Sequence, residues 1–556
     1  MARNPKETLT WTAPGPGEWS LDRSHVNRPA TPINIHMQIP STGIGTGRGF
    51  RELGAPLGSL EFRQVNGLFY SRVFPLIGAN KPPKKLPPLP VLKLATKLHP
   101  EMRRRAKIAE QTIANPPWRA KTKEWHRPGG LRDTYIAQNL EIQRVDPATL
   151  DDAALIAYVN STIEHGRKCF EDHIYLHNFD LGAIGIFFFA TSQWGFTTND
   201  VLELLEGASP STTAAGHELG AIRKLVVDAG KSPDNLNDIR NISTEASQAV
   251  DAFLERRGNM IISRYDIDGL TLGESPDVLF TRIMSAPLHK GDEEQRRAVV
   301  QQRIDAVRMR VPEQHRPEFD QLLTEARDAM DLRDENGPVT LEWPFGLVRR
   351  ALLELGRRMR ARGLAHSPEH ALELAPEEIN SALTDNSPGA DDLAARQTWR
   401  TTVNIEDAPR KLGNPEPVPP LDILPKGLAY VAGYIQKIVV ELGLDGTPKT
   451  TGLNGYGVGT TAYTGTARLA TTPEAAIDQL APGEILVVPC TTPAYNMVVG
   501  FAGALVTAEG GPLSHAAVIA RELGIPAIVG APRAMLDIRD GATIEVDPVK
   551  GSVRIL

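Results

Sequence analysis

The chain has 556 residues, which is enough for about three or four domains and for a sizeable buried core. Its 41% hydrophobic and 23% charged residues exclude a disordered chain, and a formal net charge of −6 argues against nucleic acid as the primary partner. Only two cysteines occur, Cys169 and Cys490, which excludes a disulfide framework and a thiolate zinc site. We therefore expect a cytoplasmic protein.

The sequence also gives no reason to expect a membrane partner. The first thirty residues have no apolar stretch of signal-peptide length. The longest apolar run, Leu181–Ala190, is about half as long as a bilayer span requires. We interpret this run as a buried helix or the wall of a pocket.

The first 407 residues divide by composition into two regions. Residues 1–130 are rich in Pro and Gly and predict a region of loops and small strands packed on the next domain. Residues 131–407 have long segments with apolar residues at helical spacing, which predicts a mainly helical domain. The clearest segments are Asp151–Phe170, Glu293–Val311, Pro317–Met330 and Gly346–Arg362.

A linker and a smaller module follow. Residues 408–450 predict a spacer, Pro409–Pro425, with six prolines, and then a short helix, Leu428–Leu442. Residues 451–556 predict a C-terminal α/β module, because short β-branched strands alternate with glycine turns and one clear helix. The predicted strands are Ile485–Val488, Ala504–Thr507, Ala527–Val529, Thr543–Val546 and Val553–Leu556. The fold class is α+β and multidomain.

The most informative segment of the module is EGGPLSHAAVIARELGIPAIVG, Glu509–Gly530. An apolar strand leads into Gly510 and Gly511, which allow a tight turn and a close approach of backbone N–H groups to a ligand. Ser514 is positioned to cap the helix that follows, and Gly524 ends that helix. His515 is therefore expected in the first turn of a helix, directly after a glycine turn.

This position suits His515 for covalent phosphoryl transfer. The partial positive charge at a helix N-terminus disfavours imidazolium, so a ring nitrogen should stay nucleophilic near pH 7. The same N–H groups, with the Ser514 hydroxyl, can stabilise an attached phosphoryl group. The alternative is a plain surface histidine that caps a helix.

The segment resembles the swivelling phosphohistidine domain of the phosphoenolpyruvate-utilising enzymes, a family that includes rifampicin phosphotransferase. In that family the histidine of the GG-x-[ST]-H-A pattern carries phosphate, and the resemblance implies this role for His515. Three further segments are similar to family motifs: Gly465–Arg468, Pro482–Val487 and Asp540–Val553. This chain departs from the pattern in having both Pro512 and Leu513 before Ser514, and TTAYT at Thr460–Thr464 where many relatives have a Ser-Pro-Gly turn.

Family members load their histidine through an ATP-grasp domain or a phosphoenolpyruvate-binding barrel, and the chain has a good candidate for neither. DAGKS, Asp228–Ser232, is no phosphate loop because Leu225 stands where that loop needs glycine. TGIGTGRG, Thr42–Gly49, is either a phosphate cradle or a plain loop, and GYGVG, Gly455–Gly459, is interpreted as a turn that enters the last domain. We therefore expect a separate ATP-grasp-type subunit that brings ATP, together with Mg²⁺.

The helical region resembles the acceptor-binding domain of rifampicin phosphotransferase-like proteins in Glu325–Gly337 and Phe345–Leu364. Such a chain is also similar to phenylphosphate synthase, in which the ATP-binding part is a separate subunit. The resemblance implies a dikinase-type phosphotransferase with a phosphohistidine intermediate. Its substrate would be a small apolar alcohol or phenol held by the helical domain.

Seven side chains of the helical region are further candidates. Arg327, Arg333 and Arg349 could neutralise a transferring phosphoryl group, or could form ion pairs on helix faces. His173 and His177 share a helix face and could act as a general base or hold a metal, or could be ordinary core residues. The apolar run with Phe188, and Trp194 beyond it, could line an apolar pocket or fill the core.

Three functions fit these observations. The first is a phosphotransferase component that carries phosphate on His515 to a hydroxyl. The second is a dehydratase or condensing enzyme in which phosphate is a transient leaving group. The third is a non-catalytic phosphocarrier or binding protein.

Overall fold

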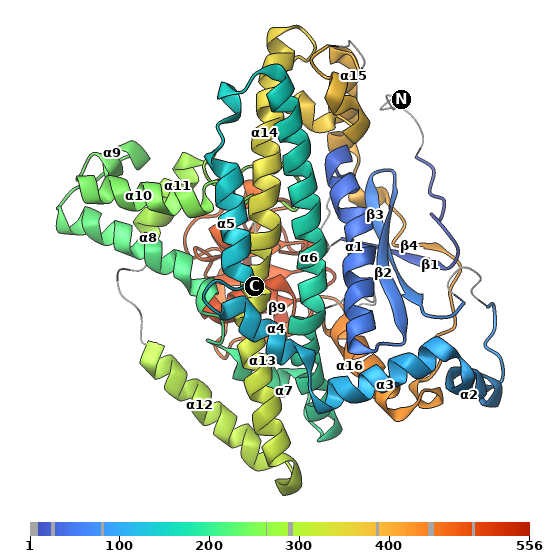
Figure 1. The fold of residues 1–556 in the computed structure, drawn as a ribbon. Helices are drawn as coiled ribbons and strands as arrows, with labels where there is room; N and C mark the ends of the chain where they lie inside the picture. The colour runs from blue at the N-terminus through green and yellow to red at the C-terminus, as the bar shows by residue number, and fades with distance from the viewer. Residues whose placement is uncertain are drawn as a thin grey trace. The chain divides into compact units, whose positions relative to one another are not determined.

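The longest helix, α6 (Asp152–Gln193), runs beside several other helices in the computed structural model (Figure 1). The structure describes residues 9–23, 28–78, 83–262, 264–286, 288, 293–384, 388–442, 450–491 and 495–556. An 18-residue window of α6 is apolar enough to span a bilayer, but 67% of that window is buried. That burial is typical of a core helix in a soluble protein, and Leu181–Ala190 lies within it as a buried helical run.

The chain folds as two units. The first contains residues 1–189, 266–268 and 336–438, and the second contains 190–265, 269–335 and 439–556. The described elements of the first unit include β1 (Glu18–Leu21), α1 (Pro32–Leu53), β2 (Leu57–Val65), β3 (Leu68–Pro75), α2 (Leu89–Leu98), α3 (Pro100–Ala114), α4 (Pro117–His126), α5 (Leu131–Arg144), most of α6, α14 (Trp343–Ala361), α15 (Ala390–Thr402), β4 (Lys411–Gly413) and most of α16 (Lys426–Glu441).

The expectation of loops and small strands for residues 1–130 is wrong where α1 to α4 form helices, whereas β1 to β3 are small strands as expected. The glycine-rich segment TGIGTGRG lies inside α1, so it is neither a phosphate cradle nor a plain loop. Its glycines let α1 approach α6 closely. A Cβ atom at Gly45 would lie 2.6 Å from the Glu171 carbonyl oxygen, and one at Gly49 would lie 2.0 Å from the Asn178 side chain.

The Pro-rich segment Pro409–Pro425 is not a free spacer. Its strand β4 joins the antiparallel sheet β2-β3-β1-β4 by pairing with β1. The Tyr70 hydroxyl donates a hydrogen bond to the Pro409 carbonyl oxygen over 2.8 Å, and Arg72 forms an ion pair of 2.6 Å with Glu416. The chain instead passes from the first unit to the second inside α16, between residues 438 and 439.

The second unit combines helices with the C-terminal module. Its described helices are α7 (Thr198–Leu202), α8 (Pro210–Asp228), α9 (Leu236–Arg240), α10 (Thr244–Arg257), α11 (Pro276–Ser285), α12 (Glu293–Arg310) and most of α13 (Arg316–Gly337). The helices α8 to α11 share an apolar core that includes Leu219, Ile239, Val250 and Ile283. The four clearest helical segments predicted from the sequence of residues 131–407 correspond to α6, α12, α13 and α14.

The C-terminal module is an α/β fold around a sheet in the order β11-β10-β6-β7-β8-β9-β5. Strands β6 to β9 are parallel, whereas β5, β10 and β11 are antiparallel to their neighbours. The elements are β5 (Tyr456–Val458), β6 (Tyr463–Leu469), α17 (Pro473–Gln479), β7 (Ile485–Val488), α18 (Asn496–Val499), β8 (Ala504–Thr507), α19 (His515–Leu523), β9 (Ala527–Val529), α20 (Ala534–Asp537), β10 (Thr543–Asp547) and β11 (Ser552–Ile555). The five predicted strands are confirmed, whereas GYGVG forms the edge strand β5 and not a simple entry turn.

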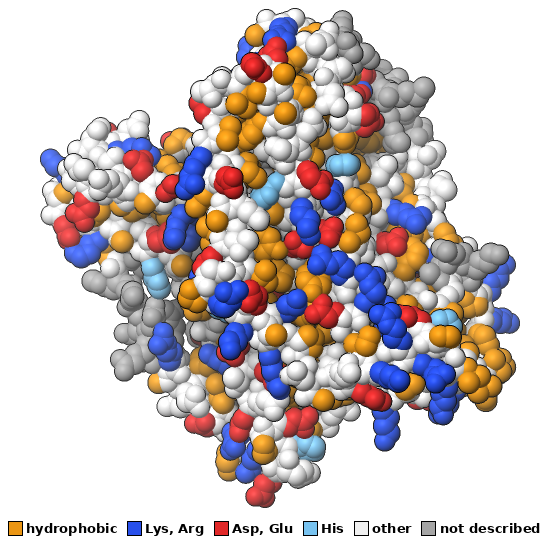
Figure 2. Space-filling model, viewed as in Figure 1, with side chains coloured by type: hydrophobic (Ala, Val, Ile, Leu, Met, Phe, Trp, Pro, Cys, Tyr) orange, Lys and Arg blue, Asp and Glu red, His pale blue; other side chains and the backbone are white. Residues whose placement is uncertain are grey.

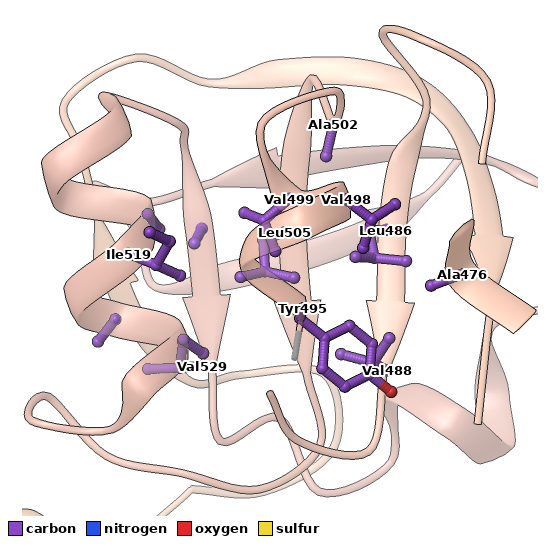
Figure 3. Packing of buried hydrophobic residues seen from close by; sticks show 14 of the residues in the cluster. Ala476, Leu486, Val488, Tyr495, Val498, Val499, Ala502, Leu505, Ile519 and Val529 are labelled. Atoms are coloured by element: carbon purple, nitrogen blue, oxygen red, sulfur yellow. The ribbon is translucent and has the colours of Figure 1, made fainter. Parts of the chain in front are cut away.

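Apolar side chains cover both faces of this sheet. On one face, α18 and α19 pack on β7, β8 and β9 through residues such as Val499, Leu505 and Ile519 (Figure 3). On the other face, Val487, Val506 and Ile528 contact a cluster that includes Ala534 of α20. This two-sided burial explains the continuous apolar runs of β7 and β8, and it fixes the edge of the sheet where the candidate site lies.

Candidate functional site

The site lies at the carboxyl edge of two neighbouring parallel strands. Strands β7 and β8 are in register at their last residues, Val488 and Thr507. The segments that follow them must therefore meet at one edge of the sheet, which is the usual place for ligand sites in such folds. The segment after β7 supplies Thr491, and the segment after β8 supplies Gly510 to His515.

The turn before α19 depends on glycine. Gly510 has a φ of +117°, and a Cβ atom there would lie 2.9 Å from the Ser514 Oγ atom. The Gly511 carbonyl oxygen accepts a hydrogen bond of 2.9 Å from the Ser514 N–H group, which closes the turn. Other residues would be strained at Gly510, so the glycine sets where the helix begins.

Helix α19 begins at His515, as expected, and Ser514 is its N-cap. The Ser514 side chain accepts a hydrogen bond from the Ala517 N–H group over 3.4 Å. The first backbone N–H groups of the helix consequently lie beside the imidazole. This arrangement can stabilise negative charge on a group attached to His515.

The His515 ring is held through one nitrogen. Its Nδ1 atom lies 2.9 Å from the Oγ1 atom of Thr491, a buried residue that the motif did not indicate. Thr491 could have been predicted from its place just after β7, because that segment ends at the same edge of the sheet as the segment with His515. Because Nδ1 is engaged, Nε2 is the ring nitrogen left to react.

His515 is neutral over a wide pH range. Its burial, and then the nearby Arg333 guanidinium, lower the pKa of His515 to about 3. Burial is the largest cause of this lowered pKa, whereas the sequence had pointed to the positive end of the helix dipole. The ring therefore keeps a free electron pair near pH 7.

Arg333 of α13 lies at this site. Its Nη2 atom donates a hydrogen bond of 2.8 Å to the Leu513 carbonyl oxygen, and its Nη1 atom contacts Asp334 over 3.0 Å. Arg333 therefore forms an ion pair, which was one of the two interpretations made from the sequence, and its role toward a phosphoryl group stays a prediction. A guanidinium there disfavours imidazolium and would favour a phosphoryl group.

Buried charges surround the rest of α19. The Arg521 side chain is 5% exposed, and its three nitrogens have no hydrogen-bond partner. Burial raises the pKa of Glu522 to about 7, and it also raises the pKa of Asp334. Buried charges with incomplete pairing are costly, so this packing of α19 is weakly stabilised.

The other arginine candidates serve different contacts. Arg327 donates hydrogen bonds to the carbonyl oxygens of Leu204 and Glu206 in the second unit. Arg349 is buried in the first unit, where its Nη1 atom donates to the Ile267 carbonyl oxygen over 3.2 Å. These contacts hold backbone segments of the unit to which each arginine belongs.

The two histidines of α6 lie together in the first unit. Their ring centroids are 4.5 Å apart, and His173 Nδ1 lies 3.1 Å from Thr340 Oγ1. His177 Nδ1 lies 2.9 Å from the buried Asp180 carboxylate. Since the carboxylate orients the ring, His177 has the geometry of a general base.

Phe188 and Trp194 do not share a site within one unit. Phe188 is 1% exposed and packs in the core of the first unit, beside Phe187. Trp194 belongs to the second unit and stacks on His315 at a centroid distance of 5.2 Å. Of the two interpretations made for Phe188, pocket wall or core residue, the structure therefore shows the core residue.

Among the residues that the structure describes, no group of three His, Cys, Asp or Glu side chains could hold a metal ion. The described residues thus do not fit a resident magnesium site.

Comparison with known proteins gives a family match in this module. Residues 480–551 match the family "PEP-utilising enzyme, mobile domain". The chain is 30% identical over 388 residues to chondramide synthase cmdD of Chondromyces crocatus, which covers 64% of this chain and 10% of that protein.

Two further relatives are phosphotransferases by name. Rifampicin phosphotransferase of Streptomyces sviceus is 27% identical over 355 residues, which covers 58% of this chain and 36% of that protein. The uncharacterized phosphotransferase YvkC of Bacillus subtilis is 28% identical over 242 residues, which covers 43% and 27%. The chain thus spans between a tenth and about a third of the length of these relatives.

Proposed function

Because residues 480–551 are a mobile domain of the PEP-utilising enzyme family, we propose that this chain is the carrier and acceptor-binding part of a phosphotransferase. His515 carries phosphate from a separate ATP-binding subunit to a hydroxyl of a small apolar acceptor, an alcohol or a phenol. The observation that carries the proposal is a neutral imidazole at a helix N-terminus, with Nδ1 held by Thr491 and the Arg333 guanidinium beside it.

The first step forms a phosphorus–nitrogen bond. The Nε2 electron pair of His515 attacks the phosphorus of the donor, and the bond from phosphorus to the leaving oxygen breaks. Nδ1 then loses its proton to solvent. The Thr491 hydroxyl can accept a hydrogen bond from Nδ1–H before the attack and donate one to Nδ1 afterwards.

The second step reverses this chemistry on the acceptor. The acceptor hydroxyl oxygen attacks phosphorus, the bond to Nε2 breaks, and the hydroxyl proton restores the neutral ring. The N–H groups of α19 stabilise the negative charge on the phosphoryl group during both steps, and Arg333 of α13 adds its positive charge in the second step, when the module is back in contact with α13. The mechanism is of the dikinase type, with a phosphohistidine intermediate.

Two conditions accompany this proposal. The donor nucleotide arrives with Mg²⁺ on the partner subunit, because the described residues of this chain offer no cluster for that ion. The carrier module must also leave its contacts with α13 to be loaded, and the incompletely paired Arg521 makes that release less costly. The reaction takes place in the cytoplasm.

The test uses phosphoramidate, a small phosphoryl donor that needs no partner subunit. We expect mass spectrometry under alkaline conditions to find one phosphoryl group on His515 of the intact chain. His515→Ala should lose this modification, whereas the matched control His173→Ala should keep it. Equal labelling of wild-type chain and His515→Ala would overturn the assignment.

The fate of phosphate separates the proposal from its alternatives. A phosphorylated alcohol or phenol supports the phosphotransferase. Free phosphate with an altered, unphosphorylated acceptor would instead indicate a dehydratase or condensing enzyme. Phosphorylated His515 that transfers to none of a panel of apolar alcohols and phenols would indicate a non-catalytic phosphocarrier.

A further inference from the structure

Helix α2 turns its apolar residues toward solvent. Val91, Leu94 and Leu98 follow the spacing of one helix face, and they are 55%, 57% and 63% exposed. On the opposite side, Leu92 is half-buried and Thr96 is buried, and the Thr96 hydroxyl donates a hydrogen bond of 3.0 Å to the Ile423 carbonyl oxygen. The helix therefore leaves much of its apolar surface exposed.

Basic side chains surround this apolar face. Between residues 83 and 109 the sequence has eight Lys and Arg residues, of which Arg105 is buried, and a single carboxylate, Glu101, in a chain whose net charge is −6. The residues Lys84, Lys85, Lys93 and Lys97 are exposed. Figure 2 shows hydrophobic side chains gathered over α2, at the lower right, with Lys and Arg around them. A partner that binds this face must be apolar where it contacts the helix and negatively charged around that contact.

We propose that α2 binds the surface of an anionic lipid bilayer. Val91, Leu94 and Leu98 would enter the acyl boundary, while Lys93 and Lys97 would reach the anionic headgroups. The concentration of positive charge in this one segment favours a lipid surface, because polybasic segments are attracted to anionic membrane surfaces.

Two other occupants fit this face less well. A second copy of the chain would bring the same lysines together, and like charges repel. Protein interfaces are depleted in lysine, and their strongest contacts come from aromatic and arginine side chains. The face of α2 has aliphatic residues and lysines instead.

The inference changes one expectation drawn from the sequence. We expected no membrane partner because neither a signal peptide nor a spanning segment was found. Peripheral binding through a short basic amphipathic helix requires neither of them.

The experiment is co-sedimentation of the intact chain with vesicles of phosphatidylcholine and phosphatidylglycerol at low salt. We expect binding to these vesicles and little binding to phosphatidylcholine alone, with release at high salt. The double variants Leu94→Glu/Leu98→Glu and Lys93→Gln/Lys97→Gln should each weaken binding by roughly tenfold or more. Because all four side chains are exposed, the variants should fold normally, and thermal unfolding checks this.

The matched control is Leu536→Glu/Val549→Glu, which makes the same charge change at two residues that are each 74% exposed in the C-terminal module. We expect this control to bind vesicles like the wild-type chain. Equal binding by the control and by Leu94→Glu/Leu98→Glu would overturn the proposal, as would no binding to the anionic vesicles. A dimer that Leu94→Glu/Leu98→Glu dissociates, with no vesicle binding, would assign the face to a second copy and also overturn it.

Discussion

The Arg333 guanidinium donates a hydrogen bond of 2.8 Å to the Leu513 carbonyl oxygen, two residues before His515 in the chain. The positive charge comes from α13, whereas the imidazole belongs to the C-terminal module. A residue far away in the sequence therefore acts on the electrostatics of the histidine. The charge should be removable without changing the fold of the module.

We expect Arg333→Gln to raise the pKa of His515, because the guanidinium is one of the two causes that lower it. Burial, the larger cause, should remain and keep the pKa below its ordinary value. NMR titration of the labelled imidazole measures the change. The control Arg327→Gln, whose guanidinium contacts the Leu204 carbonyl, should leave the titration of His515 unchanged. An unchanged pKa in Arg333→Gln would contradict the assignment.

Thr491 provides a second prediction. In Thr491→Val the shape of the side chain is kept but the hydrogen bond to His515 Nδ1 is lost. Phosphorylation of His515 by phosphoramidate should slow by about tenfold, the usual effect of losing one such bond. The control Thr460→Val changes an exposed residue of the same module and should react at the wild-type rate. If both variants react alike, Thr491 does not orient the ring.

The sequence predicted the C-terminal module well because its signals are local. Each strand was a β-branched run between glycine turns, and the start of α19 followed from Ser514 and the glycines before it. The contacts of His515 could not be predicted in the same way. Thr491 reaches the ring, and Arg333 the Leu513 carbonyl, only because the sheet register and the packing of α13 bring separate segments together.

The N-terminal region shows the opposite case. Glycine and proline are local signals for loops, and they predicted loops across residues 1–130. In α1 the glycines serve a tertiary contact, because they remove side chains where α6 approaches. Packing against a neighbour, which a single sequence does not display, overrides their weak helix propensity.

The same helix α1 permits a matched pair of substitutions. A Cβ atom at Gly45 would lie 2.6 Å from the Glu171 carbonyl oxygen, whereas one at Gly43 would make an ordinary contact of 3.4 Å with Glu61. Gly43→Ala should stabilise the chain by about 0.5–1 kcal/mol through helix propensity. Gly45→Ala should destabilise it by about 1–3 kcal/mol through overpacking. Chemical denaturation measures both, and a stabilising Gly45→Ala would refute the close packing of α1 on α6.

The final prediction concerns stability and pH. Burial lowers the pKa of His515 from 6.5 to about 3 and raises the pKa of Glu522 from 4.5 to about 7. Between about pH 4.5 and 6.5 the unfolded chain protonates the histidine and the folded chain protonates the glutamate. The two groups then bind equal numbers of protons in the two states, and their effects on the pH dependence of stability cancel.

Removing one group should reveal the other. In His515→Ala the unfolded state loses the proton that it bound at His515, so stability relative to wild type should fall as pH rises from about 3 to 6.5. In Glu522→Gln the folded state loses the proton that it bound at Glu522, so stability relative to wild type should rise as pH rises from about 4.5 to 7. Each slope can reach about 1.4 kcal/mol per pH unit. Denaturant unfolding at several pH values measures them, and between about pH 4.5 and 6.5 the double variant should return to the wild-type pH dependence. Parallel slopes in the two single variants would show that the burial of these groups does not control the stability of the module.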